Sequence, residues 1–208
     1  MRLHRAHALP DWDMIPSTQW NSWQRVAAGT RGWLTPGNVV SFMGLVITLL
    51  GLGLIAGEVY AWGLAVIIAG RLCDILDGMF AEATGTKGPL GEMLDAGIDK
   101  LVTLSGLVVL VAINVLPWLA AVLVLAPNLV IAVVVYFAQR QQQRIHPSRI
   151  GKIAMASAWL GLFAFVATAA SHGDISAIWR AGGYGLVGLS FLLGSWAAWG
   201  YARLLHAK

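Results

Sequence analysis

Charged residues are scarce in this chain: Asp, Glu, Lys and Arg together make up 12% of its 208 residues, whereas hydrophobic residues make up 58%. A soluble domain carries about 25% charged residues, so the composition excludes an ordinary water-soluble globule. Cys73 is the single cysteine, which excludes an internal disulfide, and we expect it to pack in a helix. No apolar run precedes Pro10, so we expect no cleavable signal peptide.

Six apolar stretches are long enough to cross a membrane as helices, which takes about 20 residues each. These stretches are Asn38–Ala56, Ala61–Ala83, Leu90–Asn114, Trp118–Phe137, Ile153–Ala170 and Ala181–Tyr201. We therefore predict an all-α integral membrane fold with six transmembrane helices. The predicted parts are an N-terminal cytoplasmic segment, residues 1–35, and a six-helix membrane domain, residues 36–208.

A short amphipathic helix is expected ahead of the first span. Between Ser17 and Arg31, one helical face carries Trp20, Trp23 and Ala27, which is typical of a helix lying in the membrane interface. An aromatic anchor at the level of the lipid headgroups explains the same residues equally well.

The basic residues are sorted by loop. With six spans, both termini share one side with the loops around Lys87 and around 140–152, and that side collects most of the Lys and Arg residues. The other side has Arg180 as its only basic residue, beside Glu58 and Asp174. The positive-inside rule then places both termini in the cytoplasm, and we expect a multi-pass protein of a bacterial cytoplasmic membrane. Topology accounts for the net charge of +4, so no nucleic-acid partner is expected.

The ten acidic residues are concentrated in one region of the chain. Six of them lie between Arg71 and Lys100, namely Asp74, Asp77, Glu82, Glu92, Asp95 and Asp99. Ionisable groups inside membrane spans are costly and are therefore functional candidates. Asp74 and Asp77 stand three residues apart and Asp95 and Asp99 four apart, so each pair shares one helical face. The turn between the two helices is short, so they are antiparallel neighbours and all four carboxylates can converge at one depth.

Four converging carboxylates repel one another unless cations neutralise them. No His or Cys stands at ligand spacing, and a ligand set made only of oxygen favours Mg²⁺, Mn²⁺ or Ca²⁺ over zinc. We expect Mg²⁺ or Mn²⁺, with two ions. In the alternative reading, the aspartates pair with Arg71 and Lys100 or lie solvated at helix ends, but two cations cannot neutralise six acidic groups.

The spacing of these residues resembles the signature of the CDP-alcohol phosphotransferase family, D-x2-D-G-x2-A-R-x8-G-x3-D-x3-D. In this chain the signature reads Asp74-x2-Asp77-Gly78-x2-Ala81-Glu82-x8-Gly91-x3-Asp95-x3-Asp99. The resemblance implies a six-span membrane enzyme that transfers a phosphatidyl group from CDP-diacylglycerol to a small alcohol and releases CMP, in phospholipid biosynthesis. We also expect a homodimer in the lipid bilayer.

The resemblance implies roles for the four aspartates. Asp74, Asp77 and Asp95 correspond to metal ligands. Asp99 corresponds to the general base and lies near a second metal ion in this scheme. The base role suits Asp99 because a carboxylate already bound to metal is a poor proton acceptor.

The resemblance also implies a nucleotide site. Gly78, Ala81 and Gly91 correspond to the residues around the cytidine. The segment that contains Asn38 and Ser41 is similar to the family's Pro-Asn-x-x-Thr segment, whose polar groups contact the nucleotide. Ordinary helix capping explains that segment equally well.

Glu82 departs from the signature, which has an arginine at this position. An anion near the phosphates of the substrate puts the usual CDP contact, or activity itself, in question. Lys87 is a candidate for supplying the missing charge, and an inactive family member is the alternative.

A basic cluster between the fourth and fifth stretches is expected to select the acceptor alcohol. Its members are Arg140, Arg144, Arg149 and Lys152, on the same cytoplasmic face as the aspartates. Such a cluster suits a phosphorylated acceptor, namely glycerol 3-phosphate or inositol phosphate, and Gly151-Lys152 resembles part of a stretch in phosphatidylglycerophosphate synthases. Topology alone explains the cluster about as well.

A divalent-cation transporter is the rival from another functional class, because intramembrane carboxylates also mark ion pathways. A transporter would carry acidic residues near the middle of several helices. The first, fourth, fifth and sixth stretches contain none, which favours the enzyme.

Overall fold

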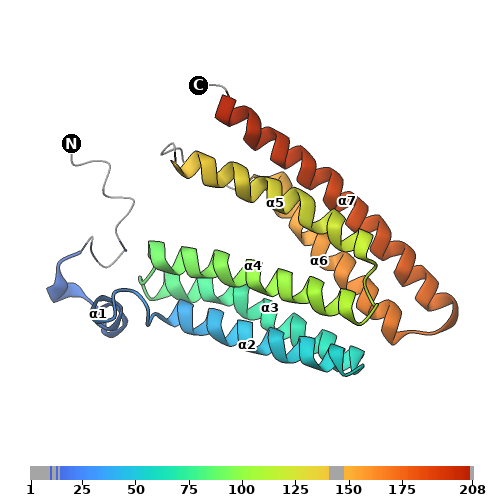
Figure 1. Cartoon of the computed structure of the whole chain (residues 1–208). Coiled ribbons are helices and arrows are strands. Elements are labelled where there is room, and N and C mark those ends of the chain that lie inside the picture. Colours follow the sequence, from blue (N-terminus) through green and yellow to red (C-terminus); the bar gives the residue numbers. More distant parts are fainter. Residues whose placement is uncertain (1–9, 11–12, 14, 141–147, 207–208) are drawn as a thin grey trace. The chain divides into compact units, whose positions relative to one another are not determined.

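The structure is a computed structural model that describes residues 10, 13, 15–140 and 148–206 (Figure 1). Every regular element in these residues is helical, as predicted: a 3-10 helix, η2 (Ser17–Gln19), and seven α-helices. The α-helices are α1 (Ser22–Gly29), α2 (Pro36–Ala56), α3 (Tyr60–Ala83), α4 (Pro89–Ala112), α5 (Trp118–Arg140), α6 (Arg149–Ala170) and α7 (Gly173–His206).

Each of the six predicted apolar stretches overlaps one of the long helices, α2 to α7. Within the described residues, four helices are long and apolar enough to cross a membrane: Pro36–Ala56, Trp118–Ala138, Arg149–Ala170 and Gly173–Arg203. The other two, α3 and α4, contain the charged residues between Arg71 and Lys100. The structure thus supports an α-helical integral membrane protein, and the count of six spans stays a prediction.

Two helices differ most from their predicted bounds. α7 begins at Gly173 rather than at Ala181, because the mixed polar and apolar segment Gly173–Arg180 forms the first turns of the helix, where Asp174 suits the positive end of the helix dipole. The interfacial helix expected from Ser17 to Arg31 is confined to α1, and Ala27 rather than Trp23 is buried on it.

The chain packs as two compact units, Met1–Gly106 and Leu107–Lys208. The predicted division at residues 35 and 36 stays a prediction. In the first unit, α2 and α3 are antiparallel and lie against each other along their length (Figure 1).

Glycines let α2 and α3 approach closely. A Cβ on Gly44 would lie 3.0 Å from the Gly70 carbonyl oxygen, and one on Gly51 would lie 2.9 Å from the Gly63 carbonyl oxygen. Gly37 continues the seven-residue step along α2 towards the N-terminal end of that helix. Small residues on facing helices are the usual means of close helix packing in a membrane, and here they fix the register of α2 on α3.

The turn between α3 and α4 is held by α1. The Asn21 side chain donates a hydrogen bond to the Thr84 carbonyl (2.9 Å), and the Gln24 side chain donates one to the Gly85 carbonyl (3.1 Å). Asn21 and Gln24 also form the capping box of α1. Gly85 has φ +61° and ends α3 in a left-handed conformation that glycine adopts without strain.

In the second unit, α7 packs against both α6 and α5. The Phe165 ring of α6 stacks edge-on against Tyr184 of α7, with ring centroids 5.1 Å apart, and it covers Gly183. Gly194 of α7 faces Pro127, the proline inside α5.

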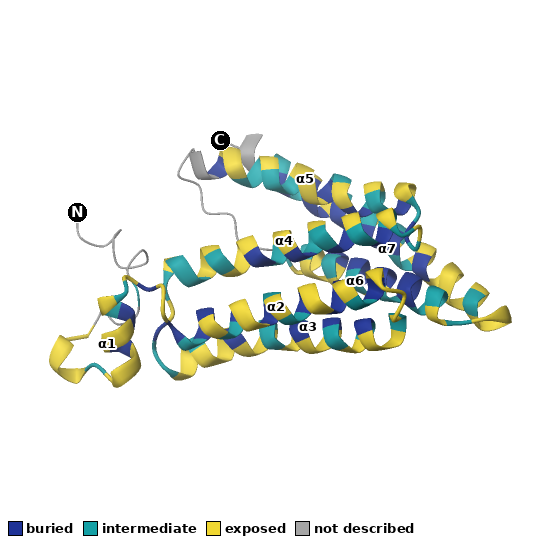
Figure 2. Ribbon diagram, turned by 60° about the horizontal axis from the view of Figure 1, so that its bottom comes forward, coloured by how far each residue is buried: buried dark blue, intermediate teal, exposed yellow. Residues whose placement is uncertain are grey.

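Much of the helices in both units is exposed (Figure 2), and many of the exposed residues are large and apolar. Examples more than 60% exposed are Leu50, Trp62, Val108, Leu129 and Leu192. Soluble monomers rarely expose so much apolar surface. These apolar surfaces therefore suit contact with the lipid chains of a membrane.

Candidate metal centre and active site

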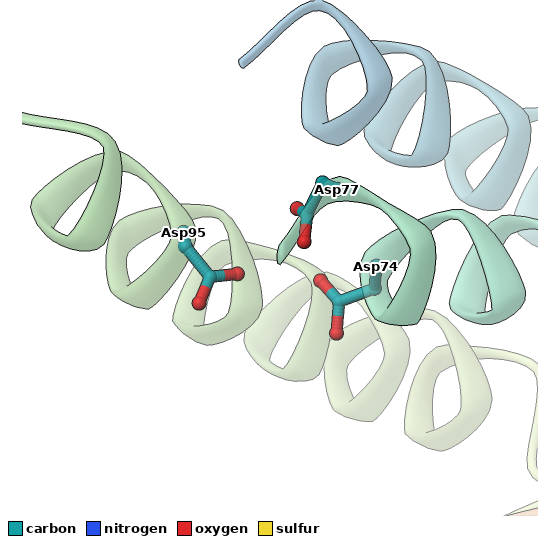
Figure 3. Close-up of side chains that lie close together, drawn as sticks. All are labelled: Asp74, Asp77 and Asp95. Atoms are coloured by element: carbon teal, nitrogen blue, oxygen red, sulfur yellow. The ribbon is translucent and has the colours of Figure 1, made fainter. Parts of the chain in front are cut away.

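Three aspartates form a compact cluster in the first unit. Asp74 and Asp77 lie on α3 and Asp95 on α4, and Figure 3 shows their carboxylates turned towards one another. One oxygen of each residue lies within 4.8 Å of the corresponding oxygens of the other two. Asp77 is buried, Asp74 is half-buried and Asp95 is exposed, so the cluster is anchored in the helix pair and remains open on the α4 side.

Helix geometry explains the cluster. Residues three apart on α3 point to the same side, and the short turn brings α4 back alongside α3. The structure therefore brings together three of the four aspartates in the predicted arrangement. Asp99, one helical turn beyond Asp95, lies outside the trio and makes a different contact.

Arg71 binds two of the aspartates through a single nitrogen. Its Nη2 atom lies 3.0 Å from an oxygen of Asp74 and 2.8 Å from an oxygen of Asp99. The pairing with Arg71 weighed from the sequence is therefore present for Asp74 and Asp99. Asp77 and Asp95 do not pair with any cation among the described residues.

Ser41 of α2 holds Asp77. Its hydroxyl donates a hydrogen bond to the Asp77 carboxylate, and both side chains are buried. The close approach of α2 and α3 allows this contact, since a Cβ on Gly37 would lie 3.0 Å from the main-chain oxygen of Asp77. Sequence reasoning assigned Ser41 to the nucleotide and missed this contact, although the seven-residue glycine steps of α2 and α3 carry the signal for the register.

The trio fits a divalent cation. Metal–oxygen distances are about 2.0–2.1 Å for Mg²⁺ and about 2.3–2.6 Å for Ca²⁺, so two oxygens on one ion are at most about 4–5 Å apart. The oxygens of Asp74, Asp77 and Asp95 meet this limit. Carboxylate oxygens are also the ligands that such hard cations prefer.

A cavity of about 210 Å³ lies beside the beginning of α2 and of α4. Its lining residues are Pro10, Arg31, Gly32, Thr35, Thr86, Gly88, Pro89, Leu90 and Gly91. Gly91 is the second glycine of the signature, one turn before Asp95. The cavity thus borders the α4 turn that leads to the metal cluster.

Asn38 fixes the start of α2 next to this cavity. Its side-chain amide donates to the carbonyls of Gly32 (2.9 Å) and Trp33 (3.1 Å), and its main-chain N–H donates to the capping Thr35 hydroxyl (3.1 Å). A Cβ on Gly91 would lie 3.1 Å from the Asn38 side-chain oxygen. Capping is therefore present, and the proposed nucleotide contact of Asn38 stays a prediction.

The remaining signature residues have different surroundings. Gly78 is exposed, with open space where a side chain would lie, whereas Ala81 is half-buried and would contact a Cβ on Gly37 at 3.1 Å. Glu82 is 74% exposed, and its carboxylate lies 3.7 Å from the Lys87 ammonium. The charge of Lys87 thus lies next to Glu82.

The basic cluster is only partly described. Arg144 and the side chain of Arg140 lie outside the described residues. Arg149 and Lys152 are exposed in the first turn of α6, in the second unit, where Ser148 caps the helix. Their role towards an acceptor stays a prediction.

Comparison with known proteins gives one match. The sequence model of the family described as CDP-alcohol phosphatidyltransferase matches residues 33–198, which includes every residue of the aspartate cluster. No significant match was found among curated proteins or solved structures.

Proposed function

The chain belongs to the CDP-alcohol phosphatidyltransferase family and is therefore a membrane transferase of phospholipid synthesis, and we propose that it moves the phosphatidyl group of CDP-diacylglycerol to a small phosphorylated alcohol. Glycerol 3-phosphate and inositol phosphate are the proposed acceptors, and CMP is the second product. The observation that carries the proposal is the convergence of Asp74, Asp77 and Asp95 at the signature spacing.

The metal proposed for the trio is Mg²⁺ or Mn²⁺. When bound, a divalent ion neutralises the diphosphate and stabilises the charge that develops on the leaving group. Asp77, oriented by Ser41, is the most buried of the three proposed ligands. Asp95, which is exposed, leaves room for the phosphates on its side.

The reaction proposed is a displacement at phosphorus. The acceptor hydroxyl oxygen forms a bond to the phosphorus that carries diacylglycerol, and the bond from that phosphorus to the bridging oxygen breaks. CMP leaves with the bridging oxygen. Asp99 takes the hydroxyl proton as general base. Arg71 holds one Asp99 oxygen at 2.8 Å, and we assign proton transfer to the other.

The proposed nucleotide site combines the cavity with the signature residues. Gly78 gives open backbone, Gly91 lines the cavity, and Ala81, Asn38 and Ser41 lie on the adjoining turns of α2 and α3. Arg31 lines the cavity, so its guanidinium is a better candidate than Lys87 for the diphosphate contact that Glu82 cannot make.

The remaining elements of the proposal come from the sequence. They are six spans in a bacterial cytoplasmic membrane, cytoplasmic termini and active site, a homodimer, and a phosphate contact for the acceptor. The cluster proposed for that contact is Arg140, Arg144, Arg149 and Lys152.

The test is CMP release from CDP-diacylglycerol by the purified protein in detergent micelles or lipid nanodiscs. The acceptor panel contains glycerol 3-phosphate, inositol 1-phosphate, inositol and serine. We expect release with a phosphorylated acceptor, loss of release with EDTA, and recovery with Mg²⁺ or Mn²⁺. Preference for inositol or serine would refute the proposed acceptor class. No CMP release with any acceptor would favour the inactive reading of Glu82.

A further inference from the structure

Arg71 is the only cation that pairs with the four signature aspartates in the described part of the chain. The signature contains no arginine at this position, one turn before its first aspartate, and the arginine that it does contain is Glu82 here. Glu82 lies next to Lys87 instead. Relative to the signature, this chain lacks the arginine at position 82 and has an additional one, Arg71, one turn before Asp74.

The Arg71 guanidinium bridges α3 and α4. A single nitrogen contacts Asp74 on α3 and Asp99 on α4, at 3.0 and 2.8 Å. The three side chains are only 21–22% exposed, so the pair is less screened than a surface ion pair. Arg71 stands three residues before Asp74, and helix geometry therefore keeps the guanidinium beside that carboxylate.

Asp74 belongs to both groups of contacts. It shares Arg71 with Asp99, and it shares the metal-compatible cluster with Asp77 and Asp95. The four aspartates therefore divide into a trio that fits one divalent ion and an Asp74–Asp99 pair that already holds a cation. A second divalent ion between Asp74 and Asp99 would meet the guanidinium at short range, where like charges repel strongly.

We propose that the Arg71 guanidinium takes the place of a second divalent ion, so that this chain uses one metal ion, at Asp74, Asp77 and Asp95, together with one built-in cation. The inference rests on the proposed function only for the metal at the trio. It replaces the two ions expected from the sequence. It also gives Arg71 a positioning role, since the guanidinium fixes the Asp99 carboxylate.

The proposal predicts the number of metal ions that the folded protein binds, independently of turnover. The probe is Mn²⁺, titrated into the purified full-length protein and followed by isothermal titration calorimetry and by electron paramagnetic resonance. The wild type should bind one Mn²⁺ per chain and give the spectrum of an isolated ion. Two ions per wild-type chain, with the spectrum of a spin-coupled pair, would overturn the proposal without any variant.

Variants then assign the effect to Arg71. Arg71→Met removes the charge but keeps an unbranched side chain, and it should admit a second Mn²⁺ at Asp74 and Asp99 with a spin-coupled signal. Arg71→Lys should retain one ion. Lys100→Met removes the cation next to Asp99 in the sequence, and because Lys100 does not pair with an aspartate in the described structure, this variant should also retain one ion.

The failure of this inference is distinguishable from failure of the proposed function. A wild type that releases CMP and binds two Mn²⁺ refutes the role of Arg71 and keeps the transferase. A wild type that binds no Mn²⁺ refutes the metal at the trio and with it this inference, whereas CMP release decides the transferase separately. If Arg71→Met does not fold, the number of Mn²⁺ ions bound by the wild type and by Asp99→Asn still tests the proposal. Asp99→Asn should bind one Mn²⁺. Loss of that ion would make Asp99 a ligand and overturn the proposal.

Discussion

The Ser41 hydroxyl donates a hydrogen bond to the carboxylate of Asp77, so a side chain of α2 orients the most buried member of the metal cluster on α3. The facing glycines make this contact possible, because they let the two helix backbones approach within van der Waals distance. The aspartate cluster therefore depends on a third helix that contributes no carboxylate to it.

Ser41→Ala should weaken metal binding while leaving the fold intact. Residues that orient metal ligands typically contribute about 10–100-fold to metal affinity, so we expect the Kd for Mn²⁺ to rise by at least about tenfold. Ser41→Thr keeps the hydroxyl and serves as the control. Calorimetric titration measures both variants, and an unchanged Kd in Ser41→Ala would show that α3 and α4 orient Asp77 without α2.

Asp95→Asn and Asp99→Asn should fail for different reasons. Asp95 is part of the trio, so Asp95→Asn should lose Mn²⁺ binding and CMP release together. Asp99 is assigned as the base, so Asp99→Asn should bind Mn²⁺ and CDP-diacylglycerol normally but lower kcat by about 100-fold or more. Binding and turnover measured on both proteins separate the roles. Equal loss of donor binding in the two variants would contradict the assignment.

The packing of α2 on α3 should be sensitive to a single methyl group. A Cβ on Gly70 would lie 2.2 Å from the Thr48 hydroxyl oxygen and 2.9 Å from the Gly44 carbonyl oxygen. Gly70→Ala should therefore destabilise the protein by about 1–3 kcal/mol through overpacking. Gly53, on the facing helix α2, has open space around it, and Gly53→Ala should be neutral or stabilising by up to about 1 kcal/mol.

Thermal unfolding in detergent compares the two glycine variants. A lower melting temperature for Gly70→Ala and an unchanged or higher one for Gly53→Ala are expected. Equal effects would mean that the glycine contacts do not set the distance between the helices. CMP release measured on folded Gly70→Ala would also show whether the Ser41–Asp77 contact follows the helix spacing.

The helices and three of the site residues could be predicted because each depends on local information. Apolar runs predicted the six long helices within a few residues, except at the first turns of α7, where charged and polar residues interrupt the apolar ones. The spacing of Asp74 and Asp77 and the short turn to α4 were enough to place Asp95 opposite them.

The place of Asp99 could not be predicted in the same way. It lies one turn beyond Asp95, about 6 Å along the helix axis, and faces Arg71 rather than the trio. The rotation of α4 about its axis decides whether Asp74 lies close to Asp95, to Asp99 or to both. That rotation is set by tertiary packing, which spacing does not encode.

Arg31 offers a test of function against stability at one position. It has φ +54° and follows the end of α1, where its main-chain N–H donates to the Ala28 carbonyl (3.2 Å). A left-handed conformation costs a residue other than glycine about 1–2 kcal/mol. Arg31 nevertheless lines the cavity that we assign to the nucleotide, and unfavourable backbone conformations are often retained at functional sites.

Arg31→Gly should therefore keep or raise the melting temperature, by relief of up to about 1 kcal/mol of strain, while it raises the KM for CDP-diacylglycerol by about tenfold. The loss follows because hydrogen bonds to charged groups contribute about 1.5–3 kcal/mol each and the guanidinium is the proposed diphosphate contact. Arg31→Lys keeps both the charge and the strain, so its KM should lie between those of the wild type and the glycine variant. Steady-state CMP release gives KM, and thermal unfolding gives stability. If Arg31→Gly binds the donor like the wild type, the residue serves only the chain reversal between α1 and α2, and the cation that offsets Glu82 lies elsewhere.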